Sequence, residues 1–277
     1  MDYQIMEPDD YTEPRCLLNM KTGLKDVPAH SVPMGRILEK LDEYLGREDW
    51  NAAERHLDYW LQDALAGGDR KGALAIENER MGFFRKRGRE QEAMEAVSHA
   101  LSLIRELSME DSITAATTCV NIATVYKTFS RADQSLPFFR QALPVYEADL
   151  KPDDPRLGGL YNNMALALAD LDQFEEADSC YQKALSVMKQ VPNGELEQAI
   201  TLLNQADLKA ARFGYEAAEE AIQDLLDKAR TLLDTPSLPR NGYYAFVLTS
   251  CAPTFRLYGR FADADELEEI AEKIYKR

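Results

Sequence analysis

The chain has 277 residues, 45% of them hydrophobic, and no apolar run reaches the roughly 18 residues that a transmembrane helix needs. Acidic residues outnumber basic ones by 48 to 32, which gives a formal net charge of −16. Nucleic acids and anionic membrane surfaces attract clusters of positive charge, so this composition argues against both kinds of partner.

The first part of the chain predicts an irregular N-terminal arm over residues 1–33. It holds four of the twelve prolines and no sustained periodicity. It also lacks the apolar core of a signal peptide, so secretion is not expected. Within the arm, residues 16–20 (CLLNM) are apolar. We expect this stretch to cap the first helical pair; the alternative, that it occupies a binding groove, stays open.

From Met34 onward the apolar residues recur at spacings of three and four, which is typical of amphipathic helices. No segment alternates strictly, as a half-buried strand would. Breaks rich in glycine and proline fall at residues 67–68, 152–155, 192–194 and 236–239. The pattern therefore predicts helices near 34–46 and 50–66, followed by paired helices that repeat every 40–46 residues until residue 275.

Small residues carry this repeat at three shared positions. The anchors are 40, 42, 42, 41 and 46 residues apart, at Ala53, Ala93, Ser135, Ala177, Ala218 and Ala264. A small residue precedes the anchor by eleven or twelve positions at Gly82, Ala123, Ala165, Ala206 and Ala252, and another follows by seven at Ala100, Ala142 and Ala184. Antiparallel helices approach closely only where side chains are small. Six stacked hairpins are therefore predicted, over about 34–68, 70–109, 112–151, 155–192, 195–235 and 240–277.

The pattern resembles the tetratricopeptide repeat, in which small and aromatic residues alternate at hallmark positions. The fourth unit carries the closest match, with Tyr161, Met164, Ala165, Leu168, Ala177, Tyr181 and Ala184. The long period, together with residues 153–155 (DDP) and 160–165 (LYNNMA), is similar to the repeats of kinesin light chains. The resemblance covers about residues 34–277. It implies an all-α, right-handed superhelical solenoid in one continuous domain. The first unit departs from the pattern at Trp60, and the sixth carries Pro253 inside its first helix.

A repeated polar position is the candidate binding site. Two residues before the upstream small residue, the repeats read Glu39, Arg80, Asn121, Asn163, Asn204 and Ser250. This position lies about 200° around the helix from the apolar stripe, so it faces away from the hairpin interface. The resemblance implies that it lines a concave surface, where the asparagines correspond to ligand-contacting residues of peptide-binding relatives.

Asparagine both donates and accepts hydrogen bonds, so a ladder of asparagines on neighbouring helices could pair with the backbone of an extended peptide. Arg80, Lys127, Arg212 and Asp207 would supply charge contacts at its edges, beside Thr124, Leu166 and Asp170. The alternative is that the asparagines bond neighbouring repeats to one another, without a ligand.

Signs of catalysis are scarce. The sequence has no glycine-rich phosphate loop and no HExxH or GxSxG motif. Paired glutamates at 175–176, 219–220 and 268–269 are expected on solvated faces. The histidines (His30, His56, His99) and the cysteines (Cys16, Cys119, Cys180, Cys251) lack ligand-like spacing, so no metal, cofactor or disulfide framework is expected. The cysteines are expected to be buried and reduced, which favours a cytoplasmic location.

The sequence therefore predicts a non-catalytic protein-interaction module that binds a peptide or an extended partner segment in a concave groove. A second hypothesis is a regulatory sensor, in which a signalling peptide changes the curvature of the solenoid. A third is an enzyme. A protein or peptide is the expected partner in the first two cases, and a homo-oligomer is compatible with the sequence.

Overall fold

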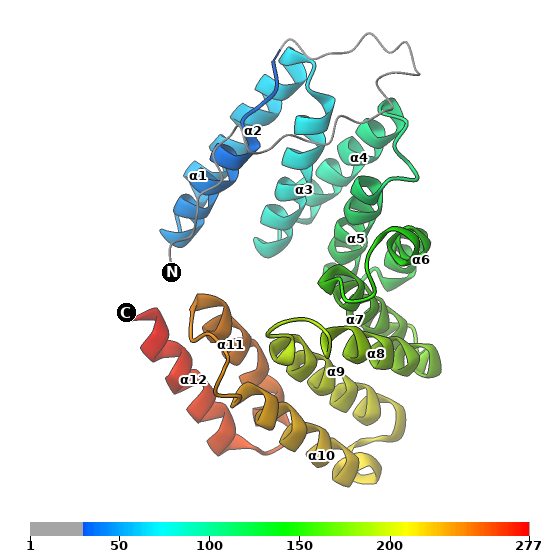
Figure 1. Cartoon of the computed structure of the whole chain (residues 1–277), viewed down its shortest axis with the longest axis vertical. Coiled ribbons are helices and arrows are strands. Elements are labelled where there is room, and N and C mark those ends of the chain that lie inside the picture. Colours follow the sequence, from blue (N-terminus) through cyan, green and yellow to red (C-terminus); the bar gives the residue numbers. More distant parts are fainter. Residues whose placement is uncertain (1–29, 277) are drawn as a thin grey trace. The chain divides into compact units, whose positions relative to one another are not determined.

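The structure is a computed structural model that describes residues 30–276. In this part of the chain all regular structure is helical, which confirms the predicted all-α class of helical hairpins (Figure 1). The apolar stretch at residues 16–20 lies outside the described residues, so its capping role stays a prediction. None of the described helices combines the length and apolar character needed to cross a membrane.

Each hairpin consists of an odd-numbered first helix and an even-numbered second helix. The helices are α1 (Met34–Gly46), α2 (Trp50–Gly67), α3 (Arg70–Lys86), α4 (Glu90–Glu106), α5 (Ile113–Thr128), α6 (Ala132–Asp149), α7 (Pro155–Asp170), α8 (Phe174–Met188), α9 (Glu195–Phe213), α10 (Tyr215–Leu233), α11 (Gly242–Leu257) and α12 (Phe261–Tyr275). The helices predicted near 34–46 and 50–66 are confirmed as α1 and α2.

The described part of the chain divides into two compact units, with the boundary between Ile76 and Glu77, inside α3. In the first unit, Asp69 joins the residues before α1 to the start of α3. Its carboxylate accepts hydrogen bonds from the backbone N–H groups of Val32 and Gly72, both at 2.9 Å. The N–H group of Gly72 lies in the first turn of α3, where backbone N–H groups have no intrahelical partner, so the buried carboxylate satisfies it.

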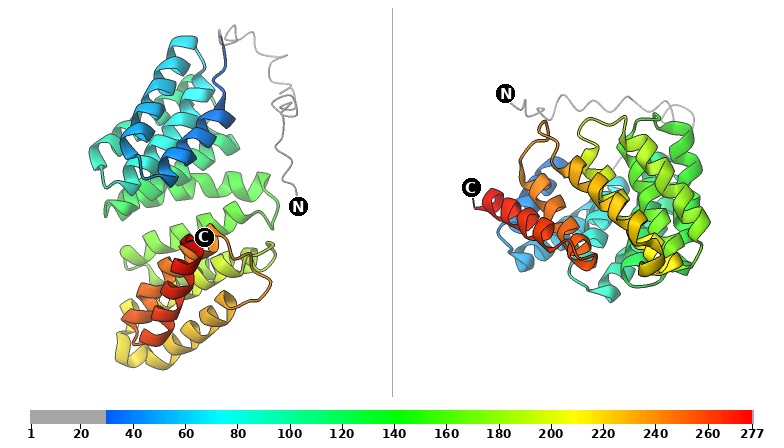
Figure 2. Two further views of the ribbon diagram at one scale, coloured as in Figure 1. Left: turned by 90° about the vertical axis from the view of Figure 1, so that its left-hand side faces the viewer. Right: turned by 90° about the horizontal axis from the view of Figure 1, so that it is seen from below.

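In the second unit the hairpins follow one another along the chain (Figure 2). From α5 to α9, each first helix contacts its own second helix and the next first helix, as in the contacts of α7 with α8 and α9. Side chains cap several first helices: Ser112, Asp154 and Asn241 accept hydrogen bonds from backbone N–H groups of the first turn. Pro155 then starts α7, where its missing N–H costs nothing.

The turn inside each hairpin contains one residue in the left-handed region of φ. These residues are Glu48, Gly88, Ser130, Asp172, Gly214 and Gly259, with φ between 55° and 79°. Half of them are not glycine, although a side chain makes this conformation costly. The reversal between two closely packed helices therefore imposes a positive φ on different residue types, although the ψ of 152° at Gly214 differs from a left-handed helical turn.

The small residues lie where the register predicted, at the contacts between helices. Ala165, Ala177, Ala184 and Ala206 are fully buried, and Ala218 is buried in α10 next to the exposed Ala217. Replacing Ala218 by leucine should therefore lower the free energy of unfolding by about 1–3 kcal/mol through overpacking. Ala217→Leu should leave it nearly unchanged. Urea denaturation of both variants tests this expectation, and equal losses would contradict the register.

Candidate functional site

Polar side chains connect successive first helices of the second unit. Between α3 and α5, the Asn121 amide donates to the Asn78 carbonyl oxygen at 2.7 Å, and the Asn78 amide donates to the Thr118 hydroxyl at 3.0 Å. Between α7 and α9, the Asn204 amide donates to the Asn162 carbonyl oxygen at 3.1 Å. Amide groups that both donate and accept thus bridge two pairs of neighbouring helices.

Further contacts of this kind join the remaining neighbours. The Lys127 ammonium of α5 lies 3.3 Å from the Asp170 carboxylate of α7. Between α9 and α11, the Tyr243 hydroxyl donates to Glu197 at 2.5 Å, and the hydroxyl of Tyr258, just after α11, donates to Asp207 at 2.8 Å. We call this set the polar belt: Asn78, Thr118, Asn121, Lys127, Asn162, Asp170, Glu197, Asn204, Asp207, Tyr243 and Tyr258.

The structure separates the three asparagines that the sequence grouped. Asn121 and Asn204 belong to the polar belt and bond neighbouring helices, which is the arrangement of the ligand-free alternative. Asn163 is half-buried on α7, and its side chain forms no hydrogen bond with any described residue. Asn163 is thus the member whose polar atoms a ligand could still pair with.

The charged residues predicted beside the ladder all contact groups of the chain itself. Arg80 Nε lies 3.2 Å from the Glu77 carboxylate, and the Arg80 guanidinium lies 5.0 Å from the centre of the Phe84 ring. Arg212 pairs with Glu175 at 2.5 Å. Lys127 and Asp207 are held within the polar belt. Any ligand charge would therefore compete with, or share, an existing contact.

Six members of the polar belt were not expected from the sequence: Asn78, Thr118, Asn162, Glu197, Tyr243 and Tyr258. Asn78 and Asn162 lie one or two positions away from the aligned column. A search for asparagine pairs 42 or 43 residues apart would have found both bonded pairs. The tyrosines carried no comparable signal, because an aromatic residue in a repeat protein usually indicates core.

Burial sets the protonation of the polar belt between α9 and α11. The pKa values of Tyr243 and Tyr258 are raised by burial and by their bonds to carboxylates, so both hydroxyls stay protonated donors at neutral pH. Burial also raises the pKa of Asp207, and the hydrogen bond from Tyr258 partly offsets this effect. Asp207 is nevertheless an exposed residue, so solvent still reaches it.

Other titratable groups of the second unit give no catalytic arrangement. Burial raises the pKa of the Cys119 thiol to about 11 and that of Cys251 to about 12, which suppresses the nucleophilic thiolate. The Glu77 carboxyl, 3.0 Å from His99 Nδ1, has its pKa raised to about 7 by burial, against the lowering effect of His99. Between residues 30 and 276 no cluster of three or more His, Cys, Asp or Glu side chains could hold a metal ion.

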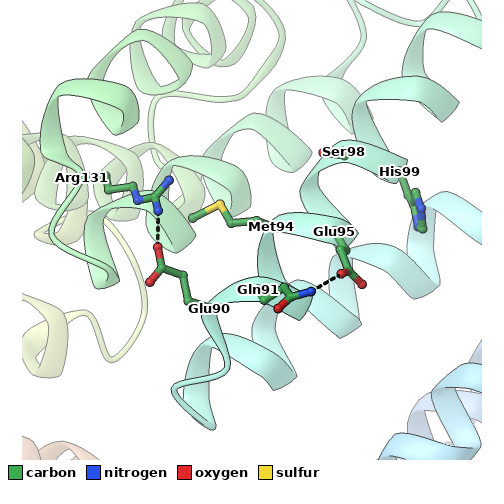
Figure 3. A pocket seen from close by; sticks show the side chains of 7 residues that line it. All are labelled: Glu90, Gln91, Met94, Glu95, Ser98, His99 and Arg131. Carbon is green, nitrogen blue, oxygen red and sulfur yellow. Dashed lines mark hydrogen bonds and ion pairs between the residues drawn. The ribbon is translucent and has the colours of Figure 1, made fainter.

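An open depression of about 650 Å³, which the sequence pattern did not predict, lies on α4 (Figure 3). Its lining is Glu90, Gln91, Met94, Glu95, Ser98, His99 and Arg131. Arg131 pairs with Glu90, and the Gln91 amide donates to Glu95 at 3.1 Å, so its polar groups satisfy one another. Because α4 is a second helix, the depression is separate from the polar belt.

Comparison with known proteins supports the repeat assignment. A tetratricopeptide repeat family model matches residues 157–231. The "Protein KINESIN LIGHT CHAIN-RELATED 2" of Arabidopsis thaliana is 27% identical over 156 residues, which is 56% of this chain and 23% of that protein. The chain thus spans about a quarter or less of the length of the curated relatives that it matches.

Two solved structures have similar folds. The TPR-like repeats of a putative kinesin light chain of Podosopora anserina give a TM-score of 0.54 at 14% identity, and the match covers 73% of this chain and 93% of that chain. NprR in complex with its cognate peptide NprX gives a TM-score of 0.59 at 16% identity, with coverage of 94% and 72%. At these identities the likeness concerns the fold, which is that of tetratricopeptide-like solenoids.

Proposed function

We propose that this chain, whose long repeats are similar to the tetratricopeptide-like repeats of kinesin light chains, is a non-catalytic module that binds an extended segment of a partner protein. The proposed site is the face of the first helices that carries the polar belt. The observation that carries the proposal is Asn163, a half-buried amide without a bonding partner among the described residues. The structure of NprR with its cognate peptide is a precedent for peptide binding by this fold.

The proposal gives the asparagines two different tasks. Asn121 and Asn204 hold neighbouring first helices in register through their bonds to Asn78 and Asn162. Asn163 lies between them in the chain, and its amide can donate to a carbonyl of an extended peptide while its oxygen accepts from an N–H group. A scaffold of bonded side chains would thus present one unpaired amide in a defined orientation.

This division predicts opposite behaviour of two matched variants. Asn163→Ala should weaken peptide binding by roughly three- to tenfold, the worth of about one net hydrogen bond, and leave the thermal midpoint unchanged. Asn204→Ala should lower the free energy of unfolding by about 0.5–1.5 kcal/mol, because Asn162 loses a donor. Fluorescence polarisation with peptides selected from a random library on the full chain would measure affinity, and urea denaturation would measure stability. A stability loss in Asn163→Ala with unchanged affinity would overturn the assignment.

The runner-up is a peptide-responsive sensor, and the polar belt is the observation that favours it. A ligand that breaks or adds a contact between successive first helices would change their spacing. Small-angle X-ray scattering of the full chain with and without a selected peptide separates the two functions. A change in the radius of gyration on binding supports the sensor, whereas an unchanged radius supports the static module.

A further inference from the structure

Helix α11 exposes apolar side chains that no described residue covers. Tyr243 is 50% exposed, Phe246 57% and Leu257 71%, and Pro253 is also exposed. Their spacings of three, seven and four residues place them within one arc of the helix. The rings of Tyr243 and Phe246 stack with centroids 6.3 Å apart. We call Tyr243, Phe246, Pro253 and Leu257 the α11 stripe.

The stripe lies on the same face as the polar belt. Ser250, which aligns with Asn163 and Asn204, is exposed within this arc, and Tyr243 belongs to both sets. The opposite side of α11, with Tyr244, Leu248 and Phe255, is buried in the core. The helix is therefore apolar nearly all round, a composition typical of a helix with a partner on each side. Exposed apolar patches next to polar groups commonly mark docking surfaces.

The charges around the stripe are negative. Glu197 and Asp207 on α9 accept hydrogen bonds from the neutral hydroxyls of Tyr243, in the stripe, and of Tyr258, the residue after Leu257. Neither carboxylate forms an ion pair with a described residue. The arginine of α11, Arg256, is neutralised by two carboxylates of α12, at 2.9 Å each. Two uncompensated carboxylates thus border the apolar surface.

We propose that the α11 stripe binds a partner segment with at least two apolar side chains flanked by lysine or arginine. Burial of the apolar side chains against Phe246 and Leu257 would supply affinity, and the cationic flanks would meet Glu197 and Asp207. A second copy of the chain fits less well, because its net charge of −16 would bring like charges together. This inference deepens the proposed function and rests on it, since it names the chemistry of the partner.

The test begins with selection from a random library of displayed 12-residue peptides on the full wild-type chain. We expect the recovered peptides to be rich in Leu, Phe or Trp with an excess of Lys and Arg. Their affinities are then measured for wild type, Phe246→Ser with Leu257→Ser, Glu197→Gln with Asp207→Asn, and Phe261→Ser. Phe261 is the matched control, because it is 58% exposed on α12, outside the stripe.

The variant Phe246→Ser with Leu257→Ser should bind the peptides about tenfold or more weakly than wild type does, and Phe261→Ser should bind them like wild type. The variant Glu197→Gln with Asp207→Asn should bind cationic peptides more weakly than wild type does, and its binding should be less sensitive to salt. This inference would be overturned, and the proposed function would remain, if the peptides bound the variant Phe246→Ser with Leu257→Ser as tightly as wild type but bound Asn163→Ala more weakly. Recovery of acidic peptides would overturn the cationic partner. Failure to recover any peptide would contradict both proposals, and a wild-type dimer in sedimentation that the stripe variant abolishes would assign the stripe to a second copy.

Discussion

Replacing Phe139 by alanine should lower the free energy of unfolding by about 3–5 kcal/mol, the usual cost of removing a fully buried phenyl ring. Phe139 is 0% exposed in α6 and packs in the core cluster that joins α5, α6, α7 and α8. Ala123 and Ala142, both fully buried, belong to the same cluster, and small residues of this kind let helices pack closely. The helices therefore cannot close over the cavity, and the loss should be near the upper end of this range.

Phe261→Ala is the control for this prediction, because the ring that it removes is mostly in solvent. It should change the free energy of unfolding by less than about 0.5 kcal/mol. Urea denaturation followed by circular dichroism measures both variants. A small loss for Phe139→Ala would mean that the core relaxes around the gap, which would be inconsistent with close packing at the alanine positions.

A single methyl group at Gly194 should cost about 3 kcal/mol, at the upper end for overpacking. Gly194 precedes α9 with φ −68°, a conformation open to any residue, so the backbone angle is not the obstacle. The obstacle is space: an added Cβ would lie 2.1 Å from the carbonyl oxygen of Met188 and 3.0 Å from that of Val191. Both are backbone atoms, so relief requires movement of the turn between α8 and α9.

Gly159→Ala provides the matched control within the same unit. An added Cβ at this position meets nothing within 4 Å. Since alanine favours the helix interior over glycine by about 0.5–1 kcal/mol, Gly159→Ala should stabilise α7 slightly. Thermal denaturation of the two variants should show shifts of opposite sign. A Gly194→Ala variant as stable as wild type would show that the turn before α9 yields more easily than its packing suggests.

The fold was predictable because its determinants are local and repeated. Small residues such as Ala165 and Ala206 recur at fixed spacing, and each is buried at a helix contact. The turns were less predictable. Ser130 and Asp172 adopt the positive φ that glycine adopts in other hairpin turns, and neither residue type predicts this conformation by itself. Packing of the two helices, which single residues do not encode, enforces that geometry.

The candidate site was predictable by position but not by partner. The sequence placed Asn121 and Asn204 on the face of the first helices, and both belong to the polar belt. It could not show that they bond to Asn78 and Asn162, because a hydrogen bond depends on helix rotation and axial shift of about an ångström. The spacing of apolar residues defines neither the rotation nor the axial shift of a helix to that accuracy. The α11 stripe was not predicted for a related reason. Apolar residues such as Phe246 and Leu257 are expected in the core, and only the packing of α11 shows that they are exposed.

The contacts between neighbouring helices have a consequence for how the chain folds during its synthesis. In the second unit, contacts join helices one or two elements apart, extensively between α7 and α8 and more sparsely between α7 and α9. Closing such short loops costs little chain entropy, so docking need not wait for distant segments. Each hairpin can therefore dock onto its predecessor as it leaves the ribosome, and the native order of assembly follows the order of translation.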